Sequence, residues 1–327
     1  MHGYRRFCNK IYQATKYVLG KLPPSFKPRL SACPTPKKSL AERWILHKLT
    51  VASRDINAAL ADREFSNAAG IVYGYWYNHL CDVYIENSKA ILTSGSREEQ
   101  ESALQTLYTA LERALTMIHP FMPFLTEELW QRLPRRPADS TPSIVKAAYP
   151  VYEKDMDDPV SEEAYELLLE VSKGIRSLTA EYSIKDSAEV VIQLFDPPSL
   201  RTCIDEVASI RSLSGKAILL GGKIQIISGQ DEKPRGAIVS PINASASVFL
   251  KVKGRVDIDV EIDKARKKLN AASEGAKKQR AMVHDEEWKH KAILSVQESE
   301  RKKLDNLEAE IRELEESIGR FETLKLE

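Results

Sequence analysis

Residues 119–130 read His119-Pro120-Phe121-Met122-Pro123-Phe124-Leu125-Thr126-Glu127-Glu128-Leu129-Trp130. The residue before a proline is pushed out of the α region, so we expect the chain to turn before Pro120 and again before Pro123. Thr126 is well placed to begin the next helix as its N-cap. The stretch therefore predicts a tight aromatic turn between two packed helices, although ordinary helix packing without any function would give the same pattern.

Apolar residues upstream of this turn recur at the three- and four-residue spacing of a helix face. The periodicity predicts helices over residues 4–22, from about Ser39, over residues 64–92, and from about Arg97 to the turn. Ser39 and Glu42 have the spacing of a capping box, which marks the start of the second helix.

These elements predict an up-and-down helical bundle over residues 1–150. In the third helix Trp76 continues the apolar stripe, so we expect it in the core. We expect its neighbours Tyr73, Tyr75 and Tyr77 to lie at the rim of the bundle.

The chain changes character after the bundle. Residues 134–159 are rich in Pro, Arg, Ser and Asp, and we expect them to wrap the bundle as a loop. Helices and strands then alternate too sparsely for a doubly wound sheet, which predicts a small α/β module over residues 160–254. Its predicted elements are helices at 162–182 and 200–213 and strands at 190–195, 216–227, 237–241 and 247–252.

Residues 258–327 have the apolar rhythm of a coiled coil. Two runs of alternating three- and four-residue steps flank a weaker stretch at 282–288, which is the expected reversal. The pattern predicts an antiparallel coiled-coil hairpin, whose limbs of about 30 residues would reach roughly 40 Å. The predicted seam consists of Ile258, Ile262, Ala265, Leu269, Ala272, Ala276, Leu304, Leu307, Ile311, Leu314, Ile318 and Phe321.

Charge is sorted along this predicted arm. Basic residues outnumber acidic ones between Lys264 and Lys303, and acidic residues prevail from Asp305 onward. A solvated coiled coil is also highly charged, but its signs are usually interleaved. Segregated cations on a projecting surface favour contact with the phosphates of a nucleic acid. The candidate contacts are Lys264, Lys267, Lys268, Lys277, Lys278 and Arg280.

Composition limits the classes of function. The chain has 327 residues, of which 43% are hydrophobic and 29% charged, and its formal net charge is +1. Any basic surface must therefore be local. Four scattered cysteines show no metal-type pairing and favour a reduced compartment, which we expect to be the cytoplasm or the mitochondrial matrix. No apolar run is long enough to span a bilayer, and we expect neither a membrane nor DNA as a partner.

Four strings of the sequence resemble the class I aminoacyl-tRNA synthetases of the valine, isoleucine and leucine group. Besides residues 119–130, they are Tyr-Arg-Arg-Phe-Cys-Asn-Lys-Ile-Tyr-Gln-Ala-Thr-Lys-Tyr at 4–17, Leu-Cys-Asp-Val-Tyr-Ile-Glu at 80–86 and Gly-Ile-Arg-Ser-Leu-Thr-Ala-Glu-Tyr at 174–182. The proline turn and the terminal hairpin are most similar to the valyl members of the group. The likeness covers essentially the whole chain, with its parts in the order found in the family.

The resemblance implies that the bundle holds the anticodon of tRNA-Val and that the arm reaches the outer corner, where the D and T loops meet. It also implies that Lys10 makes a polar or phosphate contact, that Tyr17 stacks on a base, and that Ile85 adds an apolar wall. Lys10 and Tyr17 are seven residues apart, hence on one helical face, and unstacked RNA bases commonly lie on aromatic rings. Arg5 and Arg6, one turn before Lys10, would extend a basic face, although exposed arginines usually only solvate a helix.

The ATP-site signatures of the family, of the H-I-G-H and K-M-S-K-S types, do not occur in the sequence. Neither does a glycine-rich phosphate loop or a clustered metal site. We therefore expect no catalytic residue, metal or cofactor here; ATP and Mg2+ would act in the full enzyme, whose catalytic and editing domains would be partners. Two alternatives stay open: a protein-interaction scaffold acting through its coiled coil, and the equivalent part of an isoleucyl or leucyl relative.

Overall fold

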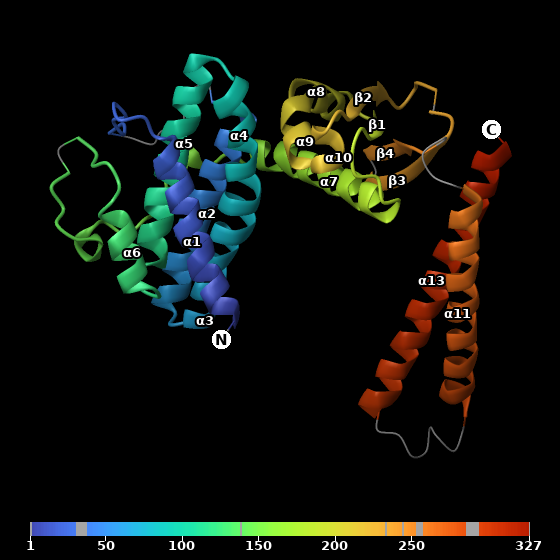
Figure 1. Cartoon of the computed structure of the whole chain (residues 1–327). Coiled ribbons are helices and arrows are strands. Elements are labelled where there is room, and N and C mark those ends of the chain that lie inside the picture. Colours follow the sequence, from blue (N-terminus) through green and yellow to red (C-terminus); the bar gives the residue numbers. More distant parts are fainter. Residues whose placement is uncertain are drawn as a thin grey trace.

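The computed structural model describes residues 2–30, 38–137, 139–232, 234–243, 245–252, 258–285 and 294–326. Figure 1 shows a helical bundle, a small α/β unit beside it and a long two-helix arm. The predicted fold class, mainly α with a small α/β module and a C-terminal hairpin, is confirmed.

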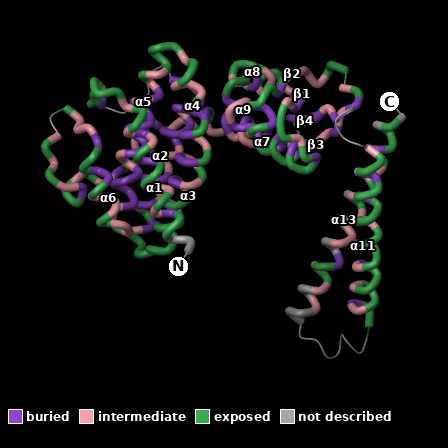
Figure 2. The backbone as a smooth tube through the Cα atoms, viewed as in Figure 1, coloured by how far each residue is buried: buried purple, intermediate pink, exposed green. Residues whose placement is uncertain are grey.

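The bundle is built from helices whose apolar stripes face a common core. Trp44, Trp76 and Leu111 are completely buried at its centre, and Figure 2 shows the buried residues on the inward sides of the helices. The elements are α1 His2–Lys21, α2 Leu40–Ala61, α3 Phe65–Gly74, η1 Tyr75–Tyr84, α4 Ile85–Ser94, α5 Arg97–Ile118 and α6 Pro123–Trp130.

Two of these helices begin where the local sequence places them. The predicted capping box of Ser39 and Glu42 starts α2, and Ser96 and Glu99 form a second box at the start of α5. Each box satisfies backbone N–H groups that a first helical turn leaves free. The starting points of both helices are therefore local properties of the chain.

The third predicted helix is continuous but not uniformly α. Its middle, η1, is a π-helix of 10 residues between α3 and α4. Bonds from i to i+5 put more residues in each turn, which shifts the phase of the inward stripe. Trp76 is in the core as predicted, and Tyr73 is 45% exposed at the rim, but Tyr75 is 1% exposed. The rim position expected for Tyr75 is therefore wrong.

The proline turn also differs from its prediction in two details. Of the two residues that precede a proline in this turn, His119 keeps helical angles (φ −51°, ψ −43°) and Met122 leaves the α region. Helix α6 begins with Pro123 in its first turn, where a missing N–H does no harm. Thr126 is buried inside α6, 2.7 Å from Nδ1 of His119, and its hydroxyl donates to the Met122 carbonyl. It therefore ties the turn together instead of capping the helix.

The segment between α6 and the next long helix wraps the bundle, as predicted. It contains two 3-10 turns, η2 Ile144–Lys146 and η3 Lys154–Met156, and buries Ile144 and Met156. The hydroxyl of Tyr149 donates to the backbone carbonyl of Met117 at 2.8 Å. This loop is therefore part of the packed structure.

A mixed four-stranded sheet forms the centre of the α/β module. Its strand order is β2-β1-β4-β3, with β1 parallel to β2 and antiparallel to β4, and β3 antiparallel to β4. Because β1 and β2 are parallel, the chain between them crosses over through short helices. The elements are α7 Pro159–Glu181, β1 Glu189–Leu194, α8 Pro197–Asp205, α9 Val207–Leu213, α10 Lys216–Leu219, β2 Lys223–Ser228, β3 Ala237–Asn243 and β4 Ala246–Lys251.

One predicted strand is partly wrong. The sequence predicts an extended run over residues 216–227, but α10 occupies Lys216–Leu219 and β2 begins only at Lys223. Gly215 and Gly221 have φ of +84° and +83°, a conformation that glycine adopts without steric cost. These two turns isolate one helical turn from the strand that follows.

Helix α7 belongs to both parts of the chain. On the bundle side, the ring of Tyr165 lies 4.8 Å from that of Trp44 in α2. On the sheet side, a Cβ on Gly174 would lie 2.3 Å from Cδ1 of Ile242, so glycine permits the close approach of helix and sheet. The hydrophobic core runs from the bundle into the module. The predicted domain boundary, between residues 150 and 160, thus lies within one continuous hydrophobic core.

The arm consists of α11 Ile258–His284 and α13 Leu294–Leu326, which run side by side in opposite directions (Figure 1). Its seam buries Ile262, Ala265, Ala272, Ala276, Val283 and Leu304. Small alanines let the two backbones approach closely, while the outward sides stay exposed (Figure 2). The predicted antiparallel hairpin is confirmed.

The structure describes only part of the predicted reversal of the hairpin. Helix α11 continues through His284, so the first part of the expected reversal at 282–288 is helical. The apolar Val283 is buried and extends the seam by another turn. Asp285 directly follows the helix, and residues 286–288 lie outside the described residues. At the opposite end, the ring of Phe321 meets that of Tyr182 edge-on at 5.8 Å and joins the arm to the module.

Candidate nucleic-acid interface

The two arginines of α11 pair with glutamates of α13. Arg266 in α11 pairs with Glu322 in α13 at 2.9 Å, and Arg280 pairs with Glu308 at 2.5 Å. Arg266 directly follows the seam residue Ala265, and Arg280 lies three residues before the seam residue Val283, so both side chains can reach across the coiled coil. Arg280, a predicted nucleic-acid contact, therefore also holds the hairpin together.

The lysines of α11 face solvent. Lys264, Lys267, Lys268, Lys277 and Lys278 are all exposed. Within the described part of the chain, the last four have no ion pair. All five lie off the buried seam, along a helix whose 27 residues extend about 40 Å. This outward lysine set has the spacing and accessibility needed to contact separate phosphates.

Lys10 on α1 is placed very differently. Its ammonium lies 2.6 Å from the carboxylate of Asp82 and 3.2 Å from the centre of the Tyr77 ring. Burial by itself would lower the pKa of Lys10, but the hydrogen bond and charge of Asp82 outweigh it and raise the pKa. The lysine is therefore a charged group whose field is largely cancelled by its neighbour.

Tyr17 lies two turns further along the same face of α1. It is half-buried, and burial raises the pKa of its hydroxyl. The ammonium groups of Lys21 and Lys89 each lie 5.7 Å from its ring centre, within cation–π range. A partly exposed aromatic ring near two cations can receive an RNA base.

The other two predicted bundle contacts have different surroundings. Arg6 is exposed on α1. Ile85, at the start of α4, is only 6% exposed and packs in the hydrophobic core. Most of the Ile85 side chain therefore lies in the core, and its role as an apolar wall stays a prediction.

Tyr73 and Tyr77 were not predicted as a site, yet they stack beside Lys10. Their rings are 5.4 Å apart and inclined by 14°, and Phe7 lies 4.7 Å from Tyr73. The four-residue spacing of the tyrosines in the sequence was the available signal. The partner Asp82 could not be foreseen, because it is 72 residues from Lys10.

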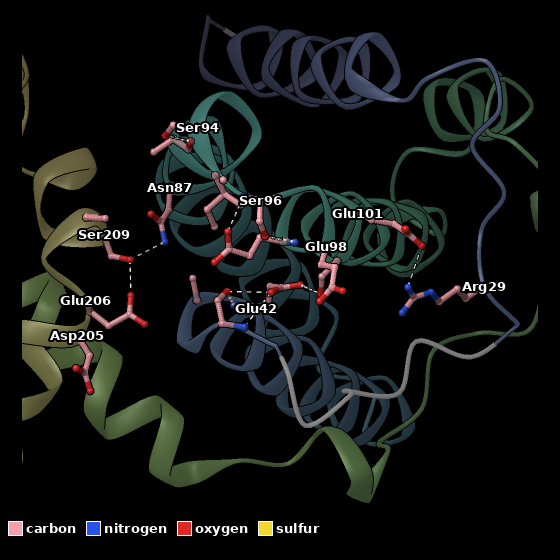
Figure 3. Close-up of a pocket in the computed structure, with 18 residues that line it drawn as sticks. Arg29, Glu42, Asn87, Ser94, Ser96, Glu98, Glu101, Asp205, Glu206 and Ser209 are labelled. Atoms are coloured by element: carbon pink, nitrogen blue, oxygen red, sulfur yellow. Dashed lines mark hydrogen bonds and ion pairs between the residues drawn. The ribbon is translucent and has the colours of Figure 1, made fainter.

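Figure 3 shows a separate cleft where the bundle meets α8 and α9, with a volume of about 860 Å³. Its labelled acidic side chains are Glu42, Glu98, Glu101, Asp205 and Glu206. Burial raises the pKa of Glu206. Because these carboxyl groups disfavour phosphate, the cleft is not a candidate for RNA backbone binding.

The described residues contain no group of side chains arranged to hold a metal ion. Over the same residues, no helix has both the length and the apolar character needed to cross a bilayer.

Comparison with known proteins agrees with this geometry. Residues 42–194, from α2 to β1, match the family model described as the anticodon-binding domain of tRNA ligase. The valine–tRNA ligase of Saccharomyces cerevisiae, named as mitochondrial, is 43% identical over 326 residues, which cover all of this chain and 29% of that protein. The chain belongs to the valine–tRNA ligase family. Other members include those of Schizosaccharomyces pombe (47% identical, 66% of this chain, 22% of that protein) and Homo sapiens (34%, 98% and 25%).

Membership in the valine–tRNA ligase family confirms the resemblance seen in the sequence. The chain spans less than a third of the length of the three relatives described above. The seam of the arm is already filled by its own second helix, so the scaffold alternative is not favoured. The isoleucyl and leucyl alternative is not favoured either, because these relatives are valine–tRNA ligases.

Proposed function

We propose that this chain binds tRNA-Val, with the bundle on the anticodon and the arm on the outer corner. In this arrangement it orients the acceptor end for catalytic and editing domains of the family. Valine ligation, with ATP and Mg2+, is proposed to take place on those domains. The outward lysine set on α11 is the observation that carries the proposal.

Continuous packing joins the bundle to the arm, which supports the proposal that both bind the same tRNA. The arm root packs on Tyr182, one residue beyond the end of α7, and α7 itself packs on α2 of the bundle. Because α7 packs on the bundle and the residue after its end contacts the arm, this one helix can set the distance between bundle and arm. A tRNA held at both ends would therefore have a defined orientation.

In the bundle, the proposed anticodon contacts are Lys10, Tyr17 and Arg6. The half-open ring of Tyr17 supplies stacking area, and Arg6 supplies an exposed charge. Ile85 adds an apolar wall through the small part of its side chain that is exposed. We propose a reduced compartment, cytoplasm or mitochondrial matrix, for the protein.

A charge-reversal variant tests the phosphate contacts of the arm. Changing Lys267, Lys268, Lys277 and Lys278 to Glu should weaken tRNA-Val binding more than tenfold. The slope of log affinity against log salt concentration should become less steep by about one for each phosphate that is no longer neutralised. Fluorescence anisotropy across a salt series measures both. The matched control reverses four exposed lysines outside the arm, Lys146, Lys154, Lys185 and Lys216.

The control should bind tRNA-Val more tightly than the arm variant at every salt concentration. Equal binding by the two variants, or no tRNA binding by the unchanged chain at low salt, would overturn the proposal. Tyr17→Ala should act differently, reducing discrimination among anticodons while leaving the salt slope unchanged.

A further inference from the structure

We propose that Tyr73 and Tyr77 form a stacking ledge for one unpaired tRNA base, and that the Lys10–Asp82 pair beside it keeps phosphate away. This inference rests on the proposed tRNA-binding function. It assigns a base-recognition role to the surface formed by α1 and the α3–η1 segment.

The ledge is preformed. The rings of Tyr73 and Tyr77 are nearly parallel, at 14° with centres 5.4 Å apart, an offset-stacked geometry that aromatic pairs favour. Phe7 supports Tyr73 from the core side at 4.7 Å, and Lys10 covers Tyr77 at 3.2 Å. Little conformational entropy remains to be lost when a flat ligand arrives.

The ledge is also accessible. Tyr73 is 45% exposed although it belongs to a large aromatic cluster. Its neighbours Tyr75 and Trp76 turn inward and are almost fully buried. The π-helix that begins at Tyr75 contains these two buried residues and the partly exposed Tyr77, and π segments occur frequently at functional sites.

Charge at the ledge selects a base over a phosphate. Asp82 is half-exposed and lies 2.6 Å from the Lys10 ammonium, so an approaching phosphate would meet a carboxylate as well as the lysine. A base carries no net charge and presents both donors and acceptors to such a pair. The Lys10–Asp82 pair therefore differs in kind from the open lysines of the arm.

Tyr73→Ala in the full 327-residue chain tests the ledge. We expect tRNA-Val to bind roughly 5- to 150-fold more weakly, the range for removing one base–aromatic stack. The salt slope should not change, because every phosphate stays neutralised as before. The matched control is Tyr12→Ala, since Tyr12 is 44% exposed but lies two residues after Lys10, toward another side of α1.

Two further variants separate stacking from folding. Tyr73→Phe keeps the ring and should bind like the unchanged chain, whereas Tyr73→Leu keeps apolar bulk without a flat ring and should bind weakly. Circular dichroism should show native helix content in both. Equal tRNA affinity of Tyr73→Leu, Tyr73→Phe and Tyr12→Ala would overturn the ledge while leaving the tRNA-binding function intact. Absence of tRNA binding by the unchanged chain would instead overturn the function itself.

Asp82→Asn tests the charge argument. Removing the carboxylate frees Lys10 for phosphate, so the salt slope should steepen by about one and tRNAs with altered anticodons should gain affinity. A uniform loss of affinity with an unchanged slope would contradict phosphate exclusion.

Discussion

Lys10 and Lys38 of the bundle and the lysines of α11 on the arm lie in opposite surroundings. In the bundle, Lys10 is paired with Asp82, and the buried Lys38 lies 3.5 Å from Glu42. On the arm, Lys277 and Lys278 are exposed and, within the described part of the chain, have no ion pair. A cation in an ion pair can still donate hydrogen bonds, but its partner cancels most of its electrostatic field. An unpaired cation keeps its full field. This contrast is the basis for assigning base recognition to the bundle and phosphate contact to the arm.

The bundle and the arm also differ in how deeply their apolar side chains are buried. Leu111 in the bundle is completely buried among several helices, while Leu304 in the arm is 8% exposed in a seam made by two. Regions with less buried apolar surface open locally at lower free energy. We therefore expect the bundle to unfold globally and the arm to open independently.

The largest expected effect comes from a matched pair of leucine truncations. Leu111→Ala should lower the free energy of unfolding by about 2–5 kcal/mol, because the bundle cannot collapse around the cavity. Leu304→Ala should cost less than about 2 kcal/mol, since the seam borders solvent. Urea denaturation followed by circular dichroism gives the first value, and hydrogen exchange in α11 and α13 gives the second.

If the arm opens independently of the bundle, Leu304→Ala will speed amide hydrogen exchange in the arm while the bundle amides stay protected. Equal acceleration in both regions would show that arm and bundle unfold as one unit.

An intermediate effect is expected where α7 is tied to α2. Glu162 accepts a hydrogen bond from Lys48 at 2.6 Å and lies 2.9 Å from Nε2 of His47. The hydrogen bond from Lys48 outweighs burial and lowers the pKa of Glu162 below its ordinary value of 4.5. Its contribution to stability is thus present above pH 4.5 and lost as the pH falls through the lowered pKa.

Glu162→Gln should therefore cost about 1 kcal/mol at neutral pH, a value reduced by the partial exposure of the pair. The difference from the unchanged chain should vanish in acid. Thermal unfolding from neutral pH to about pH 3 measures it, with the exposed Glu163→Gln as the control. A deficit that persisted in acid would mean that packing, not charge, accounts for the loss.

The smallest effect is expected at the arm pair of Arg280 and Glu308. Arg280→Gln should change stability by less than about 1 kcal/mol, because the pair is solvent-exposed. Exchange of the amides near Val283 should rise slightly. Lys278→Gln should leave that exchange unchanged but weaken tRNA binding, so the two variants separate hairpin closure from RNA contact. Identical behaviour of both would remove the distinction between inward arginines and outward lysines.

Features with a local cause could be predicted. The capping box at Ser39 and Glu42 and the seam from Ile262 onward depend on residues three or four positions apart, so the pattern alone indicates them. The outward direction of the arm lysines follows from the same spacing. In contrast, the π segment, the inward turn of Ile85 and the buried position of Thr126 depend on what packs against them.

The amino-acid sequence by itself determined the helical architecture, the hairpin and the segregation of basic residues along it, because these follow from periodicity within single elements. Only the tertiary structure decided which cations are open and which are cancelled. Asp82 reaches Lys10 across 72 residues of chain, and Glu308 reaches Arg280 across the hairpin. Such pairings depend on distances through space, and no spacing along one helix contains them.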